Sequence, residues 1–231
     1  MANNIALFKK YIDLLDEVYK DASKTSELDG DATLVRAGAN ANEIIIPKMT
    51  MDGLGDYSRN GGYAQGDVSL THETVQFNYD RGRKFDVDAM DNEETAGVAF
   101  GKLSSEFIRT KVAPEQDAFN FAIYASKAGN SANGTLSAGA DVMSAIGTAV
   151  STMDEKEVPM EGRILFITPT NLNAVKALDT TKSRELLQGF SKIVSVPQGR
   201  FYTAIDMLDG KTSGEEDGGY AKAVDVYAKT T

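Results

Sequence analysis

The sequence lacks cysteine and tryptophan, and it has a single histidine, His72, among its 231 residues. Without cysteine there is no disulfide framework, no thiol nucleophile and no thiolate-ligated zinc or iron–sulfur centre. One histidine excludes a multi-histidine metal centre within one chain, and leaves one candidate for histidine-assisted nucleophilic catalysis. His72 lies in a polar stretch, where we expect an ordinary exposed histidine. These absences exclude several common catalytic and metal chemistries.

Basic residues and long apolar runs are also scarce. The chain has 24 Lys and Arg against 34 Asp and Glu, a formal net charge of −10. Nonspecific duplex binding needs clustered basic side chains, so the acidic balance argues against it. Charges interrupt every apolar run, none approaches the ~18–20 residues of a membrane span, and the N-terminus lacks a signal-peptide pattern. We expect cytosolic synthesis and no membrane contact.

An amphipathic helix is predicted from Asn4 to about Ser23. Its apolar side chains recur at spacings of three and four: Ile5, Phe8, Ile12, Leu15 and Tyr19. This spacing places them on one face, which must pack against another surface. Two roles stay open: docking on the chain's own domain, or binding a neighbouring subunit.

Extended structure is predicted next. After a linker over 28–42 with a short strand at Thr33–Arg36, residues 43–47 form a strand that stops at Pro47. Residues 49–67 are rich in glycine but lack the phosphate-loop patterns, so we expect a flexible loop tip. Apolar and polar residues alternate over 74–79 and 84–89, which predicts a β-hairpin and an extended ribbon.

The turn of that predicted hairpin, Asp80–Arg83, carries Arg81 and Arg83 on either side of a glycine. These arginines could bind phosphate, but a salt bridge to another subunit or a solvated loop is favoured. The acidic run 85–95 does not match an EF-hand loop, because position 5, counted from Asp86, is Met90. We interpret Asp91 instead as a helix N-cap, with Glu94 completing a capping box.

A long helical strut is predicted from this cap to Lys127. Pro114 lacks a backbone donor and disfavours helix at the residue before it, so we expect a kink or break near Val112–Pro114. After a linker over 129–138, the pattern predicts a helix at 140–153, a buried strand at 163–168, helices at 171–178 and 183–190, and a strand at 192–196. This is a small α+β or α/β module. From Thr203 the chain is acidic and is predicted to be loose, without regular secondary structure, with a loop over Gly210–Gly219.

Catalytic motifs are incomplete. His72-Glu73 begins like the HExxH zinc signature, but Gln76 stands at the second histidine position, and no GxSxG occurs. Composition and motifs therefore predict an acidic, non-enzymatic α+β protein without a cofactor or metal.

Five stretches, taken in order, resemble the tailed-bacteriophage major capsid protein family, which has the HK-ninety-seven-like fold. They are GLGDYSRNGGY (53–63), DRGRKFDVDAMDNEET (80–95), VAPEQDAF (112–119), EGRILFITP (161–169) and VPQGRFY (196–202). The resemblance covers about residues 5 to 228. It implies an N-terminal arm at 1–41, an extended loop with peripheral-domain strands at 42–89, a peripheral domain with a spine helix at 90–128, and an axial domain at 129–231. The family's final peripheral strands have no counterpart before Thr231, so we expect a C-terminally truncated subunit.

The resemblance implies a major capsid protein that self-assembles through hexamers and pentamers into an icosahedral shell. Its DNA would be enclosed without sequence-specific contact, scaffolding and portal proteins would be partners, and the subunit would pass from host cytoplasm to the virion capsid. Two alternatives stay open: an encapsulin-like compartment shell, and a monomeric binding module. The candidate subunit contacts are Ile5, Phe8, Ile12, Leu15, Tyr57, Arg59, Tyr63, Arg81 and Arg83.

Overall fold

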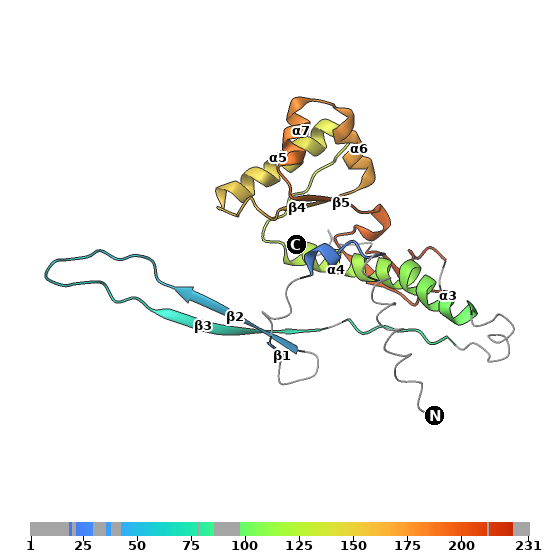
Figure 1. Ribbon diagram of the computed structural model, residues 1–231, viewed down its shortest axis with the longest axis horizontal. Coiled ribbons are helices and arrows are strands. Elements are labelled where there is room, and N and C mark those ends of the chain that lie inside the picture. The colour runs from blue at the N-terminus through green and yellow to red at the C-terminus, as the bar shows by residue number, and fades with distance from the viewer. Residues whose placement is uncertain are drawn as a thin grey trace. The chain divides into compact units, whose positions relative to one another are not determined.

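The computed structural model describes residues 19, 22–29, 36–37, 43–77, 79–85, 98–211 and 213–223. Helices and small sheets alternate in it, so the protein is a mixed α+β structure, as predicted at this coarse level (Figure 1). The chain divides into two compact units. Residues 28–87 form one unit, and residues 1–27 with 88–231 form the other.

The unit formed by residues 28–87 is built on an antiparallel sheet. Its strands are β1 (Arg36–Ala37), β2 (Glu43–Met51) and β3 (Val68–Gln76), in the order β1-β2-β3. β2 and β3 pair along all nine residues of each strand. Residues 52–67 connect them, and the loop is closed where Asp52 N donates to Asp67 O at 3.1 Å. We call β2 and β3 with this loop the ribbon.

This pairing corrects the predicted hairpin. Within the described residues β3 pairs with β2, and residues 79–85 contain no strand; 86–89 lie outside the described residues. Alternation identifies a strand and its faces, but not its partner. The prediction of a hairpin turn at Asp80–Arg83 is therefore wrong. The loop of the hairpin is instead the glycine-rich stretch.

Pro47 does not end its strand, which is a second correction. β2 continues to Met51, and Pro47 pairs with His72. Among the described residues β1 pairs only with Ile44 and Ile45, so β2 has an edge at Pro47 where no donor is needed. The short predicted strand is found as β1, which includes Arg36; residues 33–35 lie outside the described residues.

A long helical segment runs through the other unit. α3 (Val98–Phe107), a π-helical turn η3 (Ile108–Val112) and α4 (Ala113–Lys127) follow one another directly. The predicted kink or break is therefore not a break, since Ala113 keeps helical angles of φ −63 and ψ −42. A wider turn precedes Pro114, which sits in the first turn of α4, where its missing donor costs nothing. The predicted cap at Asp91 lies outside the described residues.

The helices and strands predicted over 140–196 are confirmed, with bounds shifted by a few residues. The elements of this module are α5 (Gly139–Glu155), β4 (Ile164–Ile167), α6 (Pro169–Ala177), α7 (Thr181–Gln188) and β5 (Lys192–Ser195). β4 and β5 are parallel. Thr168 caps α6 by accepting from Asn171 N, and Thr180 caps α7.

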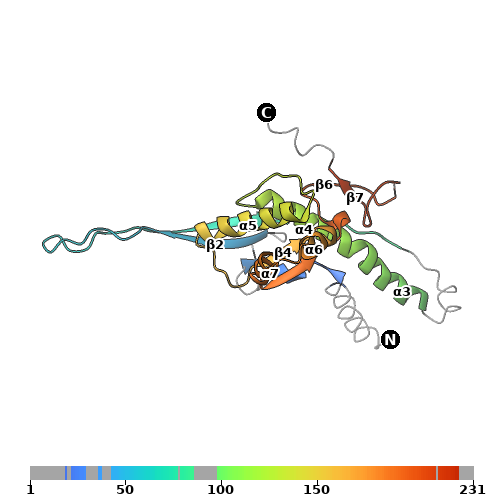
Figure 2. The same ribbon diagram turned by 90° about the horizontal axis from the view of Figure 1, so that it is seen from above.

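The helices of this module lie on one side of its two strands (Figures 1 and 2). Its core contains side chains from α5, β4 and α6: Val142, Ile146, Ile167 and Val175. Phe166, between two core-facing residues of β4, packs instead on Phe121 of α4, with ring centroids 5.3 Å apart. Phe121 also packs on Phe201 at 5.0 Å. Because side chains of β4 alternate between its two faces, one face packs in the module core and the other contacts α4 through aromatic rings.

The last described segment is ordered, which corrects the prediction of a loose chain after Thr203. A 3₁₀ turn η4 (Gln198–Arg200) precedes β6 (Ile205–Met207) and β7 (Tyr220–Lys222), which pair antiparallel. The loop predicted over Gly210–Gly219 connects them. Tyr220 is buried and its hydroxyl donates to Gly199 O at 2.7 Å. These strands are too short for a readable alternation.

Candidate assembly interface

One face of the ribbon carries an exposed apolar patch next to the loop. Residues directly opposite each other in an antiparallel pair share a face. Met49 lies opposite Leu70, and Met51 lies opposite Val68. Their exposed fractions are 60%, 56%, 68% and 68%. We call these four residues the apolar face.

The opposite face of the ribbon is polar along the same stretch of β2 and β3. Thr50 lies opposite Ser69, and Lys48 lies opposite Thr71. Lys48 also forms an exposed ion pair with Glu73, which contributes little to stability because both groups are solvated. The end of the ribbon is therefore amphipathic, with apolar and polar residues separated by the two-residue period of the strands.

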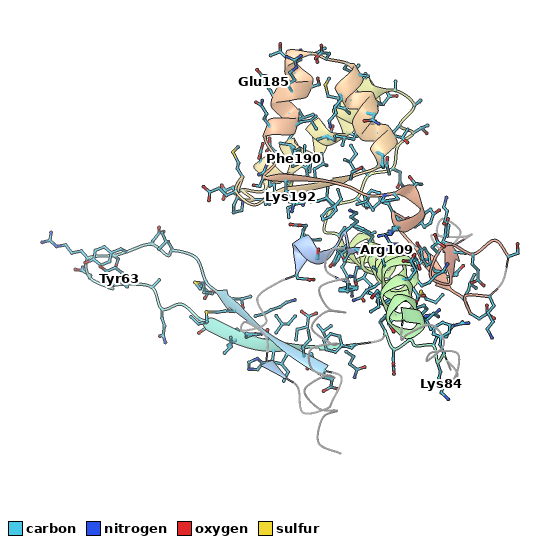
Figure 3. All side chains as sticks on the ribbon, turned by 45° about the vertical axis from the view of Figure 1, so that its right-hand side comes forward. Tyr63, Lys84, Arg109, Glu185, Phe190 and Lys192 are labelled. Carbon is cyan, nitrogen blue, oxygen red and sulfur yellow. The ribbon has the colours of Figure 1, made fainter. Side chains whose placement is uncertain are left out.

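The loop adds exposed aromatic residues. Tyr57 and Tyr63 have ring centroids 5.0 Å apart and exposed fractions of 62% and 89%. A backbone pair holds this turn, since Ser58 N donates to Gly62 O at 3.2 Å and Gly62 N donates to Ser58 O at 2.8 Å. Figure 3 labels Tyr63 at the far end of the ribbon. The structure therefore brings together two of the predicted contact residues.

The other predicted contacts are placed differently. Arg59 is exposed in the same turn. Arg81 and Arg83 are exposed in the segment after β3, beyond the end of the strand that is remote from the loop. Ile5, Phe8, Ile12 and Leu15 lie outside the described residues. The N-terminal helix is described only at its end, where Tyr19 and Ala22 are helical and Ser23 is not.

The apolar face itself was missed by the sequence reasoning. Met49 and Met51 were assigned to a loop, and Val68 and Leu70 were assigned to no strand. The alternation of MTM at 49–51 and VSL at 68–70 was the available signal. Only the pairing register shows that the two pairs meet on one face.

A network around Asp117 of α4 was also missed. Its carboxylate is fully buried and accepts hydrogen bonds from Ser23, Lys24, Thr25 and Arg200. The signal was a carboxylate between Pro114 and Ala118 on a helix face whose other residues are buried. An acidic residue on such a face must find donors inside the protein.

Within the described residues no helix is long and apolar enough to cross a membrane. The same part of the chain has no group of three or more His, Asp or Glu side chains placed to hold a metal ion. Comparisons of the chain with protein-family models, with curated proteins and with solved structures gave no match.

Proposed function

We propose that this protein is the major capsid protein of a tailed bacteriophage, a structural subunit that assembles with copies of itself into an icosahedral shell around packaged DNA. The observation that carries the proposal is the exposed apolar face on a ribbon without a core of its own. The five stretches that resemble the capsid family, in the family's order, support the same function. As part of the proposal, the role is structural rather than enzymatic.

The ribbon needs a surface to pack on. No residue of its unit is buried among 28–29, 43–77 and 79–85, for which the structure describes exposure. A two-stranded ribbon is at best marginally stable alone in water, and gains stability when one face is covered. Contiguous exposed apolar residues of this kind mark interaction surfaces. A second copy of the chain is the partner that a repeating shell supplies, because each subunit then covers one ribbon and contributes another.

The magnitudes favour many weak contacts over one strong contact. Covering the exposed part of the apolar face would contribute about 4–8 kcal/mol, taking about 1.5–3 kcal/mol for each fully buried side chain. Association of two subunits costs about 4–15 kcal/mol in lost freedom. One such contact is therefore weak, but rings and shells repeat it and become stable when they close.

The charge of the chain fits a shell wall. A net charge of −10 keeps separate subunits soluble. It also opposes tight binding to the phosphate backbone, which would hold packaged DNA to the wall. Contacts without sequence specificity are then what we propose between shell and DNA.

The test is electron microscopy of the purified full-length chain, together with light scattering over a wide concentration range. We expect rings or closed shells that accumulate as concentration rises. A monomer at every concentration would overturn the proposal and favour a binding module. Shells that co-purify with a protein cargo, and that lack portal partners, would favour a compartment shell instead.

A further inference from the structure

Asp117 sits at the centre of a buried cluster of hydrogen-bond donors. Its exposed fraction is 0%. Oδ1 accepts from Ser23 Oγ at 2.8 Å, from Thr25 Oγ1 at 2.9 Å and from Thr25 N at 3.1 Å. Oδ2 accepts from Lys24 N at 2.9 Å and from Arg200 Nη1 at 3.3 Å. Two backbone donors, two hydroxyls and one guanidinium thus converge on one carboxylate.

Further bonds tie the same turn to the unit. Arg200 Nη1 also donates to Ala22 O at 3.2 Å, and Asn120 Nδ2 donates to Thr25 Oγ1 at 3.0 Å. Ser23 and Thr25 are themselves buried. Hydrogen bonds from α4 and η4 therefore hold the turn at 23–25. These two elements lie 94 and 178 residues later in the chain, measured between the bonded residues.

The cluster depends on all of its members. A buried carboxylate is costly unless its oxygens accept several hydrogen bonds. If the turn moved away, Arg200 at 3.3 Å would be the one donor left among those described. The buried charge therefore opposes release of the turn more strongly than neutral hydrogen bonds would.

We propose that Asp117 is an anchor that holds the turn at 23–25, the link to the N-terminal segment, against α4 and η4. Because residues 5–15 carry the predicted apolar contacts, we further propose that association of subunits depends on this anchor; this second step rests on the proposed function. Asp117 is thus a positioning residue: it is fully buried and acts through the turn at 23–25.

The test measures hydrogen exchange and assembly in the same full-length preparations. Asp117→Asn keeps the shape of the side chain but removes the charge. An amide nitrogen in place of Oδ2 would face two donors, Lys24 N and Arg200 Nη1. Ser23→Ala removes one donor and leaves α4 unchanged. Asp206→Asn makes the same chemical change at an exposed position of β6 and is the matched control.

For Asp117→Asn we expect exchange in a peptide covering 19–29 to rise about tenfold, while a peptide covering 164–177 keeps its protection. Ser23→Ala should give a smaller rise, and the Asp206→Asn variant none. The assembled fraction should fall in the same order. If Asp117→Asn does not fold, the exchange measured for Ser23→Ala tests whether the cluster anchors the turn.

Unchanged exchange at 19–29 in both cluster variants would overturn the anchor. So would a rise at 19–29 that occurs only together with a rise at 164–177, because that result indicates general loosening of the unit. If the wild-type chain does not assemble at all, the proposed function fails, but the exchange measurement still tests the anchor.

Discussion

The two units of this chain differ in where their stabilising contacts lie. In the helical unit, α5, β4 and α6 bury a core, and Val175 is fully buried. In the ribbon unit, none of the residues whose exposure is described is buried, and Val68 stays 68% exposed. One unit is stabilised by its own residues, whereas the other exposes apolar residues whose burial requires another surface.

This difference separates folding from assembly. Substitutions in the core should lower the free energy of unfolding. Substitutions on the apolar face should leave unfolding nearly unchanged and act on association instead. Paired substitutions, one in each unit, test the contrast directly.

The largest expected effect on folding comes from a matched pair of valines. Val175→Ala should lower the free energy of unfolding by about 2–3 kcal/mol, since it removes two buried methyl groups and leaves a cavity. Val68→Ala should change it by less than about 0.5 kcal/mol. Denaturant titration followed by circular dichroism, below the concentration at which subunits associate, measures both. Similar losses for the two variants would contradict the contrast.

Two glycines with positive φ form the next pair. Gly218 has φ +122, and a Cβ there would lie 2.7 Å from Glu115 Cβ and 2.8 Å from Lys111 O. Gly218→Ala should therefore cost about 2 kcal/mol through strain and overlap. Gly62, in the ribbon loop, has φ +75 and open space around it. Gly62→Ala should strain only the loop, with no change in the melting of the helical unit by calorimetry.

Two cations give a smaller effect. Arg163 is 7% exposed in its side chain, pairs with Asp154 at 2.8 Å and donates to the carbonyls of Val158 and Pro159. Arg163→Met should lower the free energy of unfolding by about 1–2 kcal/mol, because Asp154 remains partly solvated. Lys48→Met, which breaks the exposed ion pair of the ribbon, should be within about 0.5 kcal/mol of wild type. Equal effects in urea titrations would show that burial does not separate the two units.

The smallest expected effect appears at alkaline pH. Burial, and then the charge of Glu216, raise the pKa of Tyr220 above its usual value, and burial with the Glu216 hydrogen bond raises the pKa of Tyr202. The unfolded state then loses its phenol protons first, so stability should fall as pH rises above about 10. Tyr220→Phe should flatten this fall, by at most about 1.4 kcal/mol at pH 11. An unchanged slope in this variant would contradict the assignment.

Much of the helical unit could be predicted from the sequence. The sequence pattern placed α5, α6 and α7 within a few residues, and a compact apolar run identified β4. These patterns lie within single helices and strands, so they predict local structure without knowledge of distant contacts. The π turn before Pro114 was missed because the sequence shows the missing donor, but not how the helix adjusts to it.

The ribbon was harder to predict, for a physical reason. Its loop was recognised, but its strand partner was not, because alternation is the same whichever strand lies alongside. The apolar face depends on register, as Met51 opposite Val68 shows. Asp117 was missed for a related reason: its donors at 23–25 and 200 are distant in sequence.

The central claim is that the apolar face joins copies of this chain. Two facing pairs at the same end of the ribbon test it: Met49→Asp with Leu70→Asp on the apolar face, and Thr50→Asp with Ser69→Asp on the polar face. Both variants place like charges opposite each other, so the cost to the ribbon itself is matched. Mass distributions of the two variants and wild type at equal concentration are the measurement. We predict monomers for the apolar-face variant and assemblies for the polar-face variant; assemblies of equal size and yield in both would contradict the claim.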